Sequence, residues 1–178
     1  MVSQPDLSVT VGGLKIKNPV ITASGTFGYA NELIPFYDPS LLGAIIVKGL
    51  SLQPMPGNPP PRIIETPCGL LNAIGLANIG IETFIKEKLP SLVNIKTPII
   101  TNIYGHTIKE YAEMAKRIEN VDRIAAIEIN ISCPNVEKGG MAFGTDPDAA
   151  ARVTDQVVKN TTKPVIVKLT PNVTDIAS

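Results

Sequence analysis

Five short apolar runs recur along the chain, separated by longer stretches of mixed polarity. Short, branched apolar runs are typical of strands buried on both faces, as in a parallel sheet. Ahead of the first run, two alternating segments flank Gly12 and Gly13, which predicts a β-hairpin over residues 7–17. The five runs cover residues 20–23, 44–47, 98–101, 126–129 and 164–167.

Three of the stretches between these runs have the apolar spacing of helices that bury one face. Residues 81–89 place apolar side chains at helical intervals. Residues 107–118 begin with a threonine and carry a glutamate three positions later, which resembles a capping box. Residues 146–158 begin with an aspartate followed by a proline, a combination that favours a helix start. Strands that alternate with helices predict βα units and a parallel sheet.

Residues 50–78 do not fit this alternation, because they contain six prolines. Proline removes a backbone donor, so this segment cannot form a regular helix or a central strand. Long loops inside a compact domain are usually functional. We therefore expect this segment to take part in a binding site.

Four of the predicted strands end in a polar residue, namely Lys48, Asn102, Asn130 and Lys168. Taken singly, such an asparagine often caps the backbone, and such a lysine often faces solvent. In parallel α/β folds, however, the carboxyl ends of the strands share one edge, where chemistry concentrates. Two ammonium groups and several carboxamides converging there would suit a planar heterocycle that gains electrons and carries imide groups.

Residues 130–135, Asn-Ile-Ser-Cys-Pro-Asn, follow the fourth run directly. Cys133 lies between Ser132 and Asn135, in a polar frame that makes it a candidate base, because free thiols titrate near ~8.5 and respond to nearby lysines. An inert buried thiol is the alternative. Cys68 has no comparable neighbours, and we expect a surface role for His106, the only histidine.

Composition narrows the function classes further. The 178 residues carry a formal net charge of zero, which argues against nucleic acid as the main partner. No apolar run approaches the length of a membrane span, and the N-terminus lacks the features of a secretory signal. The two cysteines have no metal-binding spacing. We expect a reduced, cytoplasmic protein without a metal site.

Taken together, five motifs in register along the chain resemble the dihydroorotate dehydrogenases, and most closely the class 1B catalytic subunit. Cys133 favours class 1, since class 2 enzymes carry serine there, and residues 72–76 favour class 1B over 1A. The motifs span residues 23–28, 48–51, 72–76, 130–135 and 168–171.

The resemblance implies an FMN enzyme on a TIM (β/α)8 barrel that oxidises dihydroorotate to orotate in pyrimidine biosynthesis. Cys133 would take the proton from C5 while hydride passes from C6 to the flavin, and residues 50–78 would cover the active site. The FMN contacts would be Ala23, Ser24, Lys48, Asn102, Asn130 and Lys168. The substrate contacts would be Lys48, Asn72, Ala73, Ile74, Gly75, Leu76, Asn130 and Asn135.

The resemblance also implies partners. Class 1B enzymes pair this subunit with one that carries FAD and a 2Fe-2S cluster and passes electrons to NAD. A homodimer of the catalytic subunit within a heterotetramer is the expected assembly.

The chain contains about five βα units, whereas the family's barrel has eight. We therefore expect residues 1–178 to be the N-terminal part of a single barrel domain in a longer protein. Phosphate sites in such barrels commonly follow strands 7 and 8, so the isolated chain should bind FMN poorly and be inactive. The alternatives are a catalytically silent half-barrel that serves as an assembly module, and a related flavoprotein that reduces pyrimidines.

Overall fold

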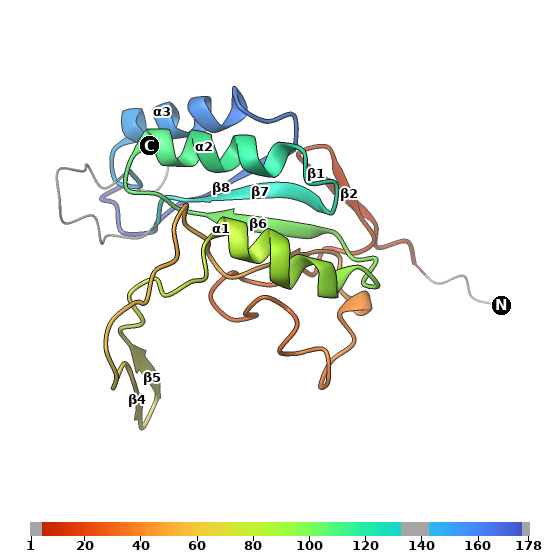
Figure 1. Cartoon of the computed structure of the whole chain (residues 1–178), viewed down its shortest axis with the longest axis horizontal. Coiled ribbons are helices and arrows are strands. Elements are labelled where there is room, and N and C mark those ends of the chain that lie inside the picture. The colour runs from red at the N-terminus through yellow and green to blue at the C-terminus, as the bar shows by residue number, and fades with distance from the viewer. Residues whose placement is uncertain (1–4, 133–142, 176–178) are drawn as a thin grey trace.

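The structure, a computed structural model, describes residues 5–132 and 143–175. Its centre is a parallel sheet in which the strands follow one another in chain order (Figure 1). The strands, in spatial order, are β3 (Ile45–Ile46), β6 (Ile99–Ile103), β7 (Ile124–Asn130) and β8 (Val165–Lys168). The predicted α/β class with a parallel sheet is confirmed, while closure into an eight-stranded barrel stays a prediction.

The first predicted strand, residues 20–23, is reduced to a single parallel bridge between Ile21 and Ala44. The physical reason lies at Thr22, whose hydroxyl takes the place of a backbone group in the ladder. Its Oγ1 accepts from the Ile46 amide at 2.8 Å and donates to the Ile46 carbonyl at 3.0 Å. The segment therefore runs beside β3 without forming a regular strand.

The predicted N-terminal hairpin is confirmed as β1 (Val9–Val11) and β2 (Leu14–Ile16), which pair antiparallel. Gly12 and Gly13 both have positive φ, which glycine adopts readily. Buried Ile16 belongs to an apolar cluster with Ala44, Ile46, Ile100 and Ala126 on one face of the sheet. The hairpin therefore lies against the sheet at the end opposite the strands' carboxyl ends (Figure 1).

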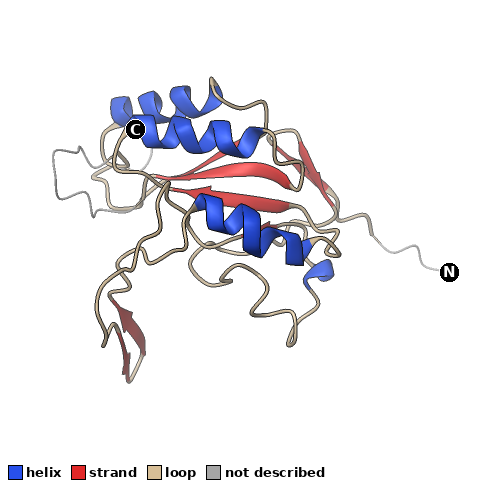
Figure 2. Ribbon diagram, viewed as in Figure 1, coloured by secondary structure: helices blue, strands red, loops and turns tan. Residues whose placement is uncertain are grey.

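The three predicted helices are present and run alongside the strands (Figure 2). Thr107 caps α2 and Asp146 caps α3 through side-chain oxygens that accept backbone amides. The first helical segment extends beyond the predicted residue 89, because a π-helical and a 3₁₀ turn prolong it. The segments are α1 (Ile81–Thr83), η2 (Phe84–Lys88), η3 (Leu89–Leu92), α2 (Ile108–Glu119) and α3 (Pro147–Val158), and a short 3₁₀ turn, η1 (Pro39–Leu41), precedes β3.

The main hydrophobic core joins these helices to the other face of the sheet. Ile127 and Ile129 of β7 contribute from the sheet, and α1, α2 and α3 contribute Ile81, Met114 and Val153. All five side chains have an exposed fraction of 0%. With the helices packed on this face, the opposite face of the sheet remains for polar side chains.

The proline-rich segment, residues 50–78, is neither helix nor central strand, as predicted, but it contains a hairpin that the sequence analysis missed. Strands β4 (Ile63–Thr66) and β5 (Gly69–Asn72) form a ribbon that projects from the body (Figure 2). Its apolar side chains are exposed, with Ile64 and Leu71 both at 64%.

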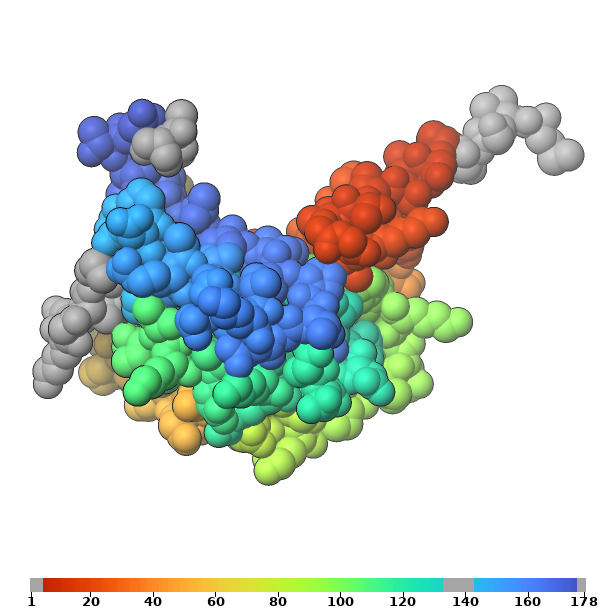
Figure 3. Space-filling view, turned by 90° about the horizontal axis from the view of Figure 1, so that it is seen from above, coloured from red at the N-terminus to blue at the C-terminus, as the bar shows by residue number. Residues whose placement is uncertain are grey.

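The space-filling view shows the N-terminal hairpin and the last described residues as two separate protrusions (Figure 3). Across the described ranges, no helix combines the length and the apolar character needed to cross a membrane.

Candidate functional site

The strand register gathers polar side chains on the inner face of the sheet, opposite the helices. Successive side chains of a strand point to opposite faces, so Ala126, Glu128 and Asn130 share one face of β7. Asn102 of β6 is in register with Glu128, and Asn130 is in register with Lys168 of β8. The inner face is therefore apolar near the N-terminal hairpin and polar at the carboxyl ends of the strands.

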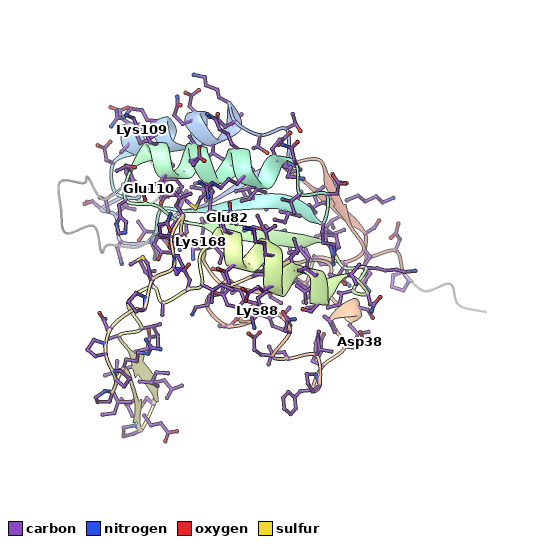
Figure 4. All side chains as sticks on the ribbon, viewed as in Figure 1. Asp38, Glu82, Lys88, Lys109, Glu110 and Lys168 are labelled. Carbon is purple, nitrogen blue, oxygen red and sulfur yellow. The ribbon has the colours of Figure 1, made fainter. Side chains whose placement is uncertain are left out.

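These polar side chains open onto a cleft with a volume of about 530 Å³, which is typical of small-ligand sites. Figure 4 shows Lys168 at this end of the sheet, near the point where the proline-rich segment leaves the body. The cleft is lined by Ser24, Gly25, Lys48, Gly49, Asn58, Asn72, Ala73, Ile74, Gly75, Leu76, Ala77, Asn102, Tyr104, Asn130, Ser132 and Lys168.

Most of the residues predicted for the site line this one cleft. They come from the ends of four parallel strands, the loop before β3 and the proline-rich segment. Ala23 is not among the lining residues, and its carbonyl accepts the Thr26 amide instead. Cys133 and Asn135 lie outside the residues that the structure describes.

Hydrogen bonds within the protein fix the side chains of the wall that the sheet provides. The Lys168 Nζ donates to Ser24 Oγ at 3.3 Å, joining two parts of the chain 144 residues apart. The Asn130 Oδ1 accepts from the Ser132 hydroxyl at 2.7 Å, and the Asn130 carbonyl accepts from the buried Tyr111 hydroxyl at 2.8 Å. These contacts hold the strand ends in position before any ligand binds.

Asn102 is the most deeply buried of the lining side chains, with an exposed fraction of 0%. Its Nδ2 donates to the carboxylate of Glu128 at 2.5 Å. Its Oδ1 is buried and has no hydrogen-bond partner among the described residues. A buried acceptor without a partner is costly, so a ligand that donates a hydrogen bond here would remove that cost.

Residues 72–76 form the opposite wall in an unusual backbone conformation. Gly75 and Leu76 both have positive φ, of 70° and 58°. Left-handed backbone at a leucine is strained, and such strain clusters at binding sites. A Cβ at Gly75 would lie 2.7 Å from the Asn58 amide nitrogen, so only glycine fits this close approach.

Asn78 anchors this second wall to the body of the protein. Its Oδ1 accepts from the Gly80 amide at 2.8 Å and from the Ser51 amide at 3.2 Å. Its Nδ2 donates to the Tyr104 hydroxyl and to the Leu76 carbonyl, both at 2.9 Å. The Tyr104 hydroxyl in turn donates to the Leu76 carbonyl at 3.0 Å. One buried side chain thus closes the base of the proline-rich segment.

Asn58 and Tyr104 line the cleft and Glu128 is the partner of Asn102, although the sequence did not predict these three residues for the site. Tyr104 and Glu128 could have been found, because each lies two positions from a predicted site residue on the same strand or its extension. Asn58 lies among prolines, where no periodicity indicates which way a side chain points.

The lining of the cleft combines positive charge with fixed hydrogen-bonding groups. Lys48 and Lys168 supply positive charge, and carboxamides supply donors and acceptors at fixed places. Within the described ranges, no group of three or more His, Cys, Asp or Glu side chains is placed to hold a metal ion.

A parallel sheet with helices on one face, and a polar cleft at the carboxyl ends of its strands, defines a ligand-binding α/β protein. The model of the family described as "Dihydroorotate dehydrogenase" matches residues 6–178. The chain therefore belongs to the dihydroorotate dehydrogenase family.

Curated relatives named "Dihydroorotate dehydrogenase B (NAD(+)), catalytic subunit" are similar over nearly the whole chain. The protein of Citrifermentans bemidjiense is 60% identical over 97% of this chain, and that of Geotalea daltonii is 57% identical over 98%. The protein of Geobacter sulfurreducens is 57% identical over 97%. The chain spans 57% of the length of each of these relatives.

Proposed function

We propose that this chain supplies the flavin and pyrimidine site of an enzyme that oxidises dihydroorotate to orotate in pyrimidine biosynthesis. The observation that carries the proposal is the cleft itself, because segments far apart in sequence meet there with the expected lysines and carboxamides. Membership of the family and the names of the relatives support the same activity.

The residues of the cleft fit FMN, which when bound would supply the acceptor for the two electrons. The buried Asn102 Oδ1 has no partner among the described residues and matches a ring N–H. Lys48 and Lys168 would stabilise negative charge that develops on the ring system. Gly25 lines the cleft without a side chain, and no atom lies within 4 Å of where its Cβ would be, so a flat ring can approach its backbone closely.

We assign the flavin contacts to Lys48, Asn102, Asn130 and Lys168 at the ends of the strands and to Ser24 in the loop before β3. Ala23, which was predicted for the same role, is not among the residues that line the cleft. The orotate ring and carboxylate would be held by Lys48, residues 72–76, Asn130 and Asn135. Cys133, which follows the cleft residue Ser132 in the sequence, would accept the proton from C5 as a thiolate. The electron pair left at C5 then forms the double bond to C6 as hydride leaves C6.

We further propose the larger context of this site. The domain would be an eight-stranded (β/α)8 barrel, of which these residues form the first part. The relatives are named catalytic subunits of an NAD(+) enzyme, which supports a partner subunit that passes electrons to NAD. That partner would carry FAD and a 2Fe-2S cluster, in a heterotetramer built on a homodimer of the catalytic subunit.

The test uses the natural product of the gene that encodes this chain. We expect the purified protein to show a flavin absorbance spectrum and to form orotate from dihydroorotate faster than it converts dihydrouracil. Preference for dihydrouracil would assign the site to another pyrimidine flavoprotein. A protein with neither flavin nor turnover, even with added FMN, would contradict the proposal and favour a silent assembly module.

The variant Lys168→Met tests the site more directly. Because a charge-assisted contact is lost, we expect the dissociation constant for FMN to rise by about tenfold or more. The matched control is Lys159→Met, since Lys159 forms an exposed ion pair with Asp155 on α3. Equal FMN affinity in the two variants would remove Lys168 from the flavin site.

A further inference from the structure

Glu128 is a buried carboxylate that lies behind the residues that line the cleft. It lies on the inner face of β7, in register with Asn102 of β6, and has an exposed fraction of 6%. Asn102 lines the cleft, whereas Glu128 is not among the described residues that do so. The two side chains are joined by the hydrogen bond from Asn102 Nδ2 to Glu128 Oε1.

This contact decides which end of the Asn102 amide faces the ligand. A carboxylate can only accept hydrogen bonds, so the Asn102 nitrogen must point to Glu128 and the oxygen must point away from it. The freed Oδ1 lies beside the cleft residue Gly49, where an added Cβ would come within 2.7 Å of it. Without Glu128, the amide could rotate by half a turn and present its donor instead.

We infer that Glu128 is a positioning residue that locks the Asn102 amide, so that the site presents an acceptor to a ring N–H of its ligand. The selected chemistry is a heterocyclic imide or lactam, which both a flavin and a pyrimidine carry. Only the identity of that ligand rests on the proposed function. The orientation of Asn102 is a property of the protein alone.

The first test needs no ligand. In protein labelled with ¹⁵N-asparagine, the side-chain amide resonances of Asn102 are assigned by their loss in Asn102→Ala. Glu128→Gln keeps the shape of the side chain, but the glutamine amide can donate a hydrogen bond as well as accept one. The Asn102 amide then no longer has one enforced orientation, so we expect its resonances to shift. Glu87→Gln, which alters an exposed carboxylate of η2, is the control and should leave them unchanged. Unchanged resonances in Glu128→Gln would overturn the inference.

The second test uses pairs of ligands that differ in one N–H. FMN is compared with 3-methyl-FMN, and orotate with its N1-methyl and N3-methyl derivatives, so the two arms separate flavin from pyrimidine. For one of these ligands, either FMN or orotate, we expect the unaltered protein to bind the parent compound about threefold to tenfold more tightly than its methylated analogue. Glu128→Gln should abolish that preference.

The double variant Asn102→Ala, Glu128→Gln shows whether Glu128 acts through Asn102. If it does, Glu128→Gln has no further effect on ligand affinity once Asn102 is alanine. Additive effects, or a preference that survives in Glu128→Gln, would overturn the inference. A resonance shift in a protein that binds neither FMN nor orotate would instead contradict the proposed function and leave the positioning role intact.

Discussion

The two walls of the cleft are built by different means. The sheet places Asn102, Asn130 and Lys168 through backbone register and a core with fully buried residues on its outer face. The proline-rich segment places residues 72–76 with little core of its own, through a few hydrogen bonds centred on Asn78. One wall therefore depends on global folding, while the other depends on one local network.

This difference suits the proposed division of labour. Most residues assigned to the flavin lie on the sheet wall, whose position depends on the folded core. Most residues assigned to the substrate lie on the other wall, and local opening of that wall would let substrate enter and leave while the sheet stays folded. Three predictions test the comparison, beginning with the largest effect.

Ile129→Ala should weaken the sheet wall most strongly. Ile129 is fully buried between β7 and the helices, so its truncation leaves a cavity and should lower the free energy of unfolding by about 3 kcal/mol. Ile64→Ala in the exposed β4–β5 ribbon should change it by less than about 0.5 kcal/mol. Urea unfolding followed by circular dichroism measures both, and similar losses would mean that the ribbon is packed in solution.

Asn78→Ala should act locally. Removing its side chain leaves partners at Ser51, Gly80 and Leu76, of which the first two are buried, without their hydrogen bonds, at a cost of about 2 kcal/mol. We expect proteases to cut faster within residues 50–78 while the sheet remains folded. Mass spectrometry of the fragments locates the cuts, and the exposed Asn94→Ala is the control. A cleavage pattern identical to that of the unaltered protein would show that the network does not anchor this wall.

Glu119 gives the smallest effect, which is present near neutral pH and is lost in acid. Hydrogen bonds from the Thr161 and Thr162 side chains and the Thr162 amide lower the pKa of this carboxyl from 4.5 to about 2. The folded-state pKa is depressed, so the stabilisation is present above pH 4.5 and is lost as the pH falls towards 2. The hydrogen bonds of Glu119 tie the end of α2 to the loop that leads into β8, so they help to hold the sheet wall.

Glu119→Gln should therefore be less stable than the unaltered protein near neutral pH, and the difference should shrink between about pH 5 and pH 2. Urea unfolding at a series of pH values measures it, with the ribbon variant Glu65→Gln as the control. A constant difference across that range would mean that the carboxylate contributes no charge-dependent stability.

The residues of the sheet wall could be predicted, because short apolar runs in the sequence indicate where each strand ends. Apolar runs gave the strand ends, and the parallel arrangement brought Lys48, Asn102, Asn130 and Lys168 to one edge. The first strand was wrong in detail, since no pattern indicates that the hydroxyl of Thr22 replaces a backbone group. The β4–β5 ribbon was not predicted, because its strands bury neither face and so show no alternation of apolar and polar residues. The hydrogen bonds of Asn78 were not predicted for a different reason. Their partners come from separate segments that only the folded chain brings together.

The agreement between strand order and chain order has a consequence for how the protein is made. Each new strand of the sheet docks on the sheet strand that precedes it along the chain, with only the strands of the β4–β5 ribbon inserted between β3 and β6. The sheet can therefore assemble strand by strand as the chain leaves the ribosome. The bond between Lys168 and Ser24 is the exception, since it closes a loop of 144 residues. This side of the cleft is therefore joined only once β8 has docked, because the contact between Lys168 and Ser24 cannot form earlier in synthesis.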